Sequence, residues 1–208
     1  MFLVTGHPRS GTSYTEQLLR ETGLTIGGER FGRRRPLEAE PDVDGVVSWQ
    51  HLPLYKGRFT TVFHQVRHPL NVISSSQTLY SGSYKTLFRY LDIPVKWYVH
   101  LYLRKIPLLF PETMLIRWSM YTWFHWNTRI ERDARIEMRY KVENLPERWS
   151  EFLQNLEVPP REMPKLSSRV NTRRNRYKAL KWEDLYEADE FLAEKIRQKA
   201  RDYGYQAD

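Results

Sequence analysis

A chain of 208 residues, 40% of them hydrophobic and 14% aromatic, is long and apolar enough to fold around a core of its own. It contains no cysteine, which excludes disulfides, zinc–thiolate centres and cysteine nucleophiles. Its formal net charge of +8 attracts anions, whether nucleic acid, acidic lipid or a highly charged cofactor, without choosing among them.

We expect neither a signal peptide nor a membrane span in this sequence. It turns polar directly after Met-Phe-Leu-Val-Thr-Gly, which is too short for the apolar part of a signal peptide. No later stretch approaches the roughly 18 apolar residues of a transmembrane helix. We therefore expect a cytoplasmic protein without a transmembrane segment. Because no repeat or linker interrupts the chain, we also expect a single domain over residues 1–208.

Strand-like and helix-like segments alternate along the chain. Residues 2–5 form a short apolar run that ends at a glycine turn, and residues 60–66 are rich in β-branched side chains. Residues 135–140 alternate apolar and charged side chains, which predicts a strand with one wet face. This alternation predicts an α/β fold, a three-layer α/β/α arrangement around a central parallel sheet. The remaining predicted elements are a strand at 24–26, a loop or lid at 27–44, helices at 13–21, 71–79, 149–156 and 190–203, and a largely helical region at 84–132.

A glycine-rich turn joins the first predicted strand to the first predicted helix. Gly6 and Gly11 enclose four residues, which is the glycine spacing of a nucleotide-binding P-loop. Backbone N–H groups of such a turn converge on a phosphate together with the positive end of the helix dipole. Thr12 stands where that loop requires lysine, and Arg9 inside the turn supplies a cation instead. We therefore expect a fold like that of the P-loop nucleotide hydrolases; the alternative is a glycine turn that only connects strand to helix.

A second candidate anion site follows the strand at 60–66. Arg67 ends that strand, and Ser75 lies eight positions further on, within the next predicted helix. An arginine and a hydroxyl so placed can contact one phosphate from two sides, and a charge-assisted contact contributes roughly 1.5–3 kcal/mol. Taken alone, the same residues also fit a surface arginine beside a capped helix.

Together these two motifs resemble those of the sulfotransferases that use 3'-phosphoadenosine 5'-phosphosulfate. Pro-Arg-Ser-Gly-Thr-Ser at residues 8–13 resembles the family's 5'-phosphosulfate loop, and Arg67 with Ser75 resembles its 3'-phosphate motif, in the same order. Residues 139–145 resemble the Arg-Tyr-Glu-Asp-Leu strand end of the family, although the Arg-Lys-Gly signature of the cytosolic branch is absent. The resemblance implies that the cofactor is bound by Arg9, Ser10, Gly11, Thr12, Ser13, Arg67, Ser75 and, in a late basic loop, Arg173 and Arg174.

The same resemblance implies transfer of a sulfuryl group to the hydroxyl of a small molecule or glycan, with 3'-phosphoadenosine 5'-phosphate as product. Arg9 would neutralise charge on the leaving phosphate, so that a metal is not required. The base is either Glu29, placed as in the bacterial trehalose-type branch, or His51, whose His-Leu-Pro context is similar to the cytosolic branch. The glutamate-base bacterial type is the nearest in its pattern.

Two other functions share part of this pattern. A P-loop-type nucleotide kinase would use the same fold but would require lysine at position 12 and a carboxylate that binds magnesium. A nucleic-acid-binding module could use the basic stretch at 169–178, with Tyr177 and Trp182 stacking on bases. That module leaves both strand-end motifs unexplained, so we expect no stable nucleic-acid partner.

Overall fold

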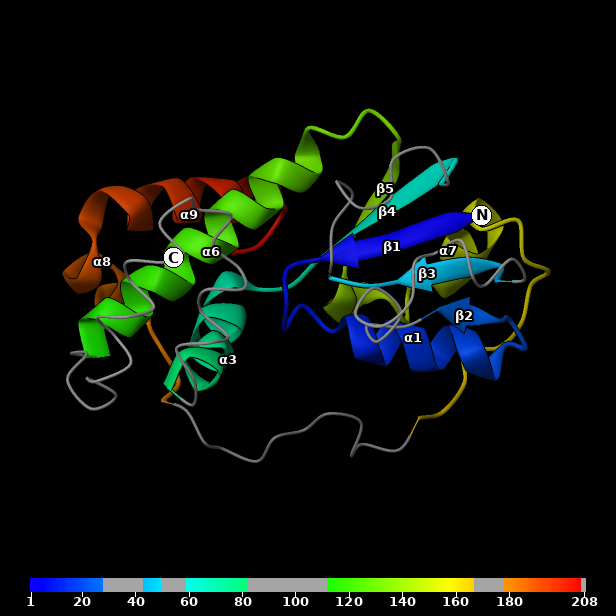
Figure 1. Cartoon of the computed structure of the whole chain (residues 1–208), viewed down its shortest axis with the longest axis horizontal. Coiled ribbons are helices and arrows are strands. Elements are labelled where there is room, and N and C mark those ends of the chain that lie inside the picture. Colours follow the sequence, from blue (N-terminus) through cyan, green and yellow to red (C-terminus); the bar gives the residue numbers. More distant parts are fainter. Residues whose placement is uncertain (28–42, 50–58, 82–111, 167–177, 207–208) are drawn as a thin grey trace, which may run out of the picture. The chain divides into compact units, whose positions relative to one another are not determined.

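The computed structural model describes residues 1–27, 43–49, 59–81, 112–166 and 178–206 (Figure 1). The chain divides into two compact units. The first comprises Met1–Arg67 and Trp126–Arg174, and the second comprises His68–His125 and Asn175–Asp208. None of the helices in these described ranges is long and apolar enough to cross a membrane.

In the described residues of the first unit, five strands form one sheet that is parallel throughout. The strand order is β2-β3-β1-β4-β5, so β1 lies in the middle, paired with β3 on one side and β4 on the other (Figure 1). Every residue of β1 is buried, which is typical of a central parallel strand covered on both faces. The strands are β1 (Phe2–Gly6), β2 (Ile26–Gly27), β3 (Gly45–Val47), β4 (Thr61–Val66) and β5 (Ile136–Lys141).

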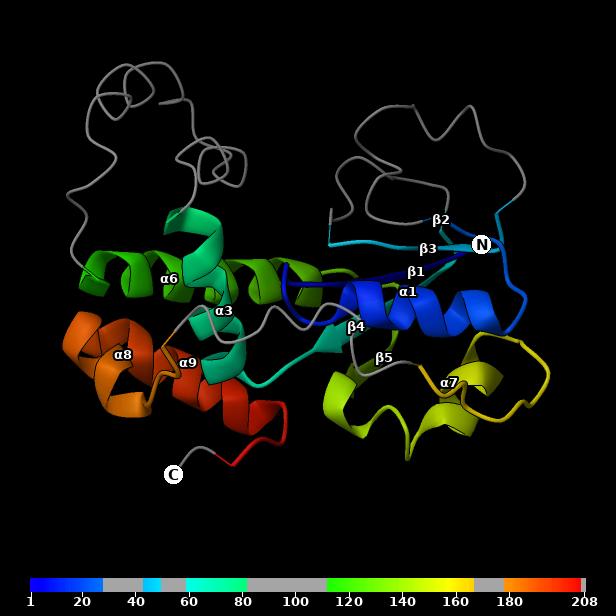
Figure 2. The same ribbon diagram turned by 90° about the horizontal axis from the view of Figure 1, so that it is seen from below.

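Helices α1 (Thr12–Glu21) and α7 (Trp149–Asn155) pack on the same face of this sheet (Figure 2). Leu18 and Leu19 of α1 join Phe152 of α7 in one buried cluster with side chains from the strands. The opposite face carries a smaller apolar cluster and the last turns of α6 (Glu112–Glu131), where His64 of β4 donates to Asn127. The predicted α/β class with a parallel sheet is confirmed, and helices on both faces are consistent with three layers.

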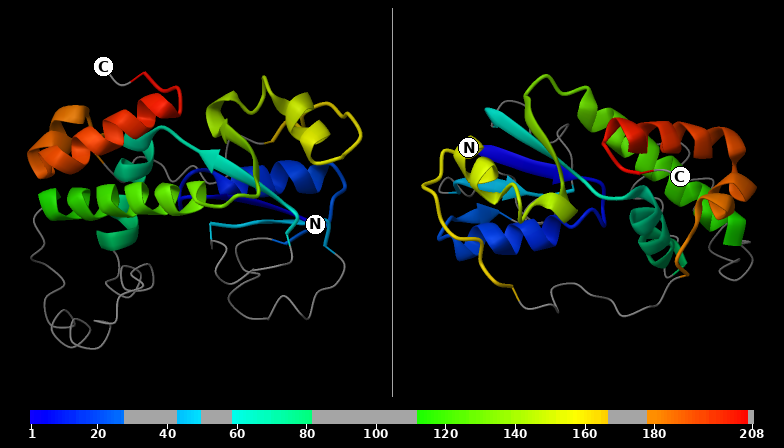
Figure 3. Two further views of the ribbon diagram at one scale, coloured as in Figure 1. Left: turned by 90° about the horizontal axis from the view of Figure 1, so that it is seen from above. Right: turned by 180° about the vertical axis from the view of Figure 1, so that it is seen from behind.

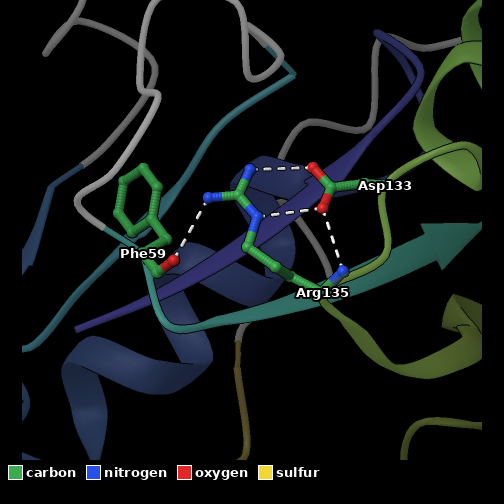
Figure 4. Close-up of polar contacts among 3 residues, drawn as sticks. All are labelled: Phe59, Asp133 and Arg135. Atoms are coloured by element: carbon green, nitrogen blue, oxygen red, sulfur yellow. Dashed lines mark hydrogen bonds and ion pairs between the residues drawn. The ribbon is translucent and has the colours of Figure 1, made fainter.

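The amino ends of β4 and β5 are tied together by one arginine (Figure 4). Arg135 donates from Nε and Nη2 to the two carboxylate oxygens of Asp133, each at 2.9 Å, and from Nη1 to Phe59 O at 3.2 Å. Asp133 Oδ1 also accepts the backbone N–H of Arg135 at 3.0 Å. Because Phe59 precedes β4 and Arg135 precedes β5, this bidentate pair fixes where the two strands begin to run side by side.

The described part of the second unit is largely helical. It contains α3 (Pro69–Ser81), the earlier turns of α6, α8 (Trp182–Ala188) and α9 (Glu190–Asp202), and α6 and α9 lie side by side (Figure 3). The rings of Trp123 and Tyr203 lie 6.0 Å apart, and Arg117 pairs with Asp189 at 2.8 Å. The hydroxyl of Ser74 in α3 accepts a hydrogen bond from the backbone of Leu180 at 3.0 Å.

The strands and helices that were predicted match the structure to within two residues where it describes them, but not every element was predicted. The strand expected at 24–26 lies at Ile26–Gly27, and the described part of the region expected to be largely helical at 84–132 is helical over Glu112–Glu131. Strand β3 was not predicted, because Gly45–Val47 is too short to show a period. The loop expected at 27–44 falls mostly outside the described residues. Helix α8 was not predicted either, and its Trp182 is only 8% exposed, which leaves little of this ring for stacking on bases.

Candidate functional site

The loop between β1 and α1 has the backbone conformation of an anion cradle. Arg9 and Gly11 adopt positive φ angles of 78° and 100°, and Ser10 N–H donates to His7 O at 2.9 Å, which closes a tight turn. Left-handed residues in such a turn bring N–H groups to one concave side. The first turn of α1 contains no acidic residue, so its own side chains do not neutralise the positive end of the helix dipole. Residues 7–11 are termed the anion loop below.

Gly6 allows the anion loop to fold back against β4. A Cβ atom at this position would lie 2.5 Å from the hydroxyl oxygen of Ser10 and still nearer to the backbone oxygen of Gln65. Gly11 is also confined, since a Cβ there would lie 3.1 Å from both Gln65 Nε2 and a methyl group of Val142. The two glycines of the predicted motif are therefore required by close packing at Gly6 and by a positive φ at Gly11.

Gln65 holds the anion loop from β4, and sequence reasoning missed it. Its side-chain Nε2 donates to Ser10 O at 2.8 Å. Its Oε1 accepts from the Thr15 hydroxyl at 2.7 Å and from the Tyr140 hydroxyl at 2.8 Å. One buried amide thus connects the loop with α1 and β5. A glutamine inside a β-branched strand was the only signal in the sequence, because a polar side chain is rare in a central strand unless it is hydrogen-bonded.

Arg67 of the second predicted motif lies beside the anion loop at the carboxyl edge of the sheet. Gly6 and Gln65 are paired in the β1–β4 register, so the loops that follow these two strands are neighbours. Arg67 Nη1 donates to Arg9 O at 3.3 Å, which keeps the Arg67 guanidinium against the anion loop. The chain runs from β1 to the edge strand β2, returns through β3 beside β1, and then crosses to β4 on the other side of β1. Ligands of open α/β sheets bind beside the strand ends at such a reversal of strand order.

The donors at this edge suit a phosphate or sulfate group. Turn N–H groups, the amino end of α1 and the Arg67 guanidinium lie close together, and all of them bind anions. Ser10 is 1% exposed, and its hydroxyl has no hydrogen-bond partner among the described residues. A buried unpaired hydroxyl is uncommon in a folded protein, and in the anion loop it is a further group that can turn toward a bound anion.

His7 is a buried side chain of the anion loop. Its Nδ1 lies against the carbonyl oxygen of Pro8, and since a carbonyl only accepts, Nδ1 carries the proton. The imidazole is buried and meets the Trp126 ring edge-on at 6.3 Å. Burial lowers the pKa of His7 to about 3, so the ring does not contribute positive charge to the site near neutral pH.

Ser75 lies in α3, six residues after the first residue of the helix, and is buried. It belongs to the second unit, whereas Arg67 is the last residue of the first segment of the first unit. The structure thus confirms that the serine is on the helix that follows the arginine. Its part in binding a 3'-phosphate stays a prediction.

Four predicted site residues lie outside the described residues: Glu29, His51, Arg173 and Arg174. The choice between the two bases and the role of the late basic loop therefore stay predictions. Within the described ranges, no group of three or more histidine, aspartate or glutamate side chains is arranged to hold a metal ion.

No protein-family model matches this chain, and neither does any curated protein.

Proposed function

We propose that this protein is a sulfotransferase that binds 3'-phosphoadenosine 5'-phosphosulfate and passes its sulfuryl group to an acceptor hydroxyl. The observation that supports it most is the contact between Arg67 and the backbone of Arg9, because it holds the Arg67 guanidinium against the anion loop. The carboxyl edge of the sheet could bind several kinds of anion. We choose this cofactor because residues 8–13, and Arg67 with Ser75, resemble the motifs of this family.

In this proposal the anion loop binds the 5'-end of the cofactor. The backbone N–H groups of the loop, the amino end of α1 and Arg9 contact the 5'-phosphate and stabilise the charge that develops on it during transfer. The close packing at Gly6 and the unpaired Ser10 hydroxyl fit a loop shaped around an oxyanion. Thr12 and Ser13 begin α1 and add hydroxyl and backbone donors.

Arg67 and Ser75 hold the 3'-phosphate, which distinguishes this cofactor from ATP. Arg173 and Arg174 reach the same phosphate from the late basic loop. The cofactor supplies the sulfuryl group, and the bond that breaks joins its sulfur to the bridging oxygen of the 5'-phosphate. Glu29 or His51 takes the proton of the acceptor hydroxyl, whose oxygen forms the new bond to sulfur.

Calorimetric titration with 3'-phosphoadenosine 5'-phosphate, ADP and ATP tests this proposal. We expect the wild-type protein to bind the bisphosphate more tightly than either ADP or ATP. The Arg67→Ala variant should lose at least about tenfold in affinity for it, as expected when a charge-assisted contact worth roughly 1.5–3 kcal/mol is removed. Arg201→Ala is the matched control, because it removes an exposed arginine from α9 and lowers the net charge equally.

Tighter binding of ATP than of the bisphosphate would favour the kinase alternative instead. If neither nucleotide binds, or if both arginine variants lose affinity equally, the proposal fails.

A further inference from the structure

Gln65 has a buried side-chain amide whose oxygen and nitrogen both make hydrogen bonds. It belongs to β4 and is covered by the anion loop, α1 and β5. Thr15 and Tyr140 both donate to its Oε1, so the side-chain oxygen faces those two residues and the nitrogen faces Ser10. The Ser10 carbonyl fixes which way the amide is turned, because it only accepts and so requires the amide nitrogen on its side, which leaves Oε1 to the two hydroxyls.

The bond from Gln65 to Ser10 O determines the direction of one N–H group in the anion loop. The described residues contain no cis peptide bond, and in a trans peptide the C=O and the following N–H point in opposite directions. Since the carbonyl of Ser10 points toward Gln65, the N–H of Gly11 points away from β4. Gly11 is the N-cap of α1, where outward N–H groups bind anions.

We propose that Gln65 is a positioning residue of the anion site, which holds the Ser10–Gly11 peptide so that the Gly11 N–H points at the bound phosphate. This rests on the proposed function, in which the loop binds the 5'-end of the nucleotide. Gln65 itself does not touch the ligand. It acts through Ser10 and Gly11, and hydrogen bonds from Thr15 and Tyr140 hold its amide in place.

This role needs a side chain that donates and accepts at once. A glutamine does so at every pH, and a protonated glutamic acid of nearly the same shape does so as well. An ionised glutamate only accepts, so it would leave Ser10 O without a donor and place a negative charge behind the phosphate. Tyr140 is the titratable group in described contact with this amide, and burial raises the pKa of its hydroxyl above its ordinary value, so it remains a donor.

The test compares Gln65→Glu with wild type in its affinity for 3'-phosphoadenosine 5'-phosphate and for inorganic sulfate at pH 5.5 and pH 8.5. Dividing the affinity of the variant by that of wild type at each pH cancels the titration of the ligand itself. We expect a ratio within about threefold of unity at pH 5.5, where burial keeps the new carboxyl protonated, and a loss of roughly tenfold or more at pH 8.5. Gln65→Leu should lose affinity equally at both pH values.

A ratio for Gln65→Glu that is the same at both pH values would overturn the positioning role and leave the proposed function intact. If wild type binds neither the bisphosphate nor sulfate, both the positioning role and the proposed function are overturned.

Tyr140→Phe provides a second test should the glutamate variant fail to fold. It deletes one donor to Gln65 with little change of shape, and thermal unfolding confirms that the variant is folded. We expect bisphosphate affinity to fall about two- to fivefold, since the Thr15 hydroxyl still holds the amide. Unchanged affinity in this folded variant would contradict the proposal.

Discussion

Gly6 is the residue at which the anion loop leaves β1, and its hydrogen side chain lets the loop lie directly on β4. We expect Gly6→Ala to lower the free energy of unfolding by roughly 1–3 kcal/mol, because the added methyl group would overlap Gln65 O and Ser10 Oγ. Because both atoms belong to the support of the loop, anion affinity should fall as well. Denaturant unfolding and bisphosphate titration measure the two effects.

Gly23→Ala is the matched control for this substitution. Gly23 follows α1 with a φ of 84°, and the nearest atom to an added Cβ is a guanidinium nitrogen of Arg161 at 3.6 Å. Only backbone strain is then expected, roughly 1–2 kcal/mol, with unchanged anion affinity. A loss of affinity in Gly23→Ala as large as in Gly6→Ala would show that close packing under the loop is not the cause.

At the scale of elements, the pairing of β4 with β5 depends on the bidentate contact between Arg135 and Asp133 (Figure 4). The side chains are 31% and 11% exposed, so solvent screens this pair less than a pair on the open surface. We expect Asp133→Asn to lower the free energy of unfolding by about 1–2 kcal/mol, because it removes the charge and one acceptor oxygen. Denaturant unfolding measures the change.

Glu151→Gln is the control for Asp133→Asn, because it alters an ion pair of the same kind that is more exposed. Arg148 donates to both carboxylate oxygens of Glu151, and the two side chains are 39% and 49% exposed. The expected change is below about 0.5 kcal/mol. If the two substitutions have equal effects on the free energy of unfolding, the partial burial of the Arg135–Asp133 pair adds nothing to the stability of the strand pairing.

At the scale of the whole molecule, His7 links stability to pH. In the folded protein its pKa is about 3, against 6.5 in an unfolded chain, so between these values the unfolded state binds a proton that the folded state does not. Stability therefore falls as pH falls from about 6.5 toward 3. One such group lowers the free energy of unfolding by about 2 kcal/mol between pH 7 and pH 5.

Urea unfolding at pH 7 and pH 5 measures this change in wild type and in His7→Asn. The asparagine keeps a donor for Pro8 O but does not titrate, so the variant should lose about 2 kcal/mol less than wild type over the same interval. Equal losses in the two proteins would mean that His7 is not the buried neutral group.

Much of the fold could be predicted from local pattern. The buried run of β1, the β-branched β4 and the alternation in β5 each carry their own period, and a glycine after β1 marks the turn. The spacing of Gly6, Arg9 and Gly11, and of Arg67 and Ser75, likewise depends on short stretches of chain. These features could be predicted because strand propensity, turn conformation and helix starts depend on residues that are neighbours in the sequence.

The tertiary structure alone decided which of these stretches support one another. Gln65 lies 55 positions from Ser10 and 75 from Tyr140, and only the parallel pairing of β4 with β1 and β5 brings the three together. Burial is likewise a property of the folded chain: it places Trp182 in the core, and it lowers the pKa of His7 so that the ring is neutral near pH 7. By itself, the sequence determined where anions are expected along the chain. How the loop that receives them is held depends on contacts between distant residues, since strand register and burial are properties of the packed sheet and not of any single segment.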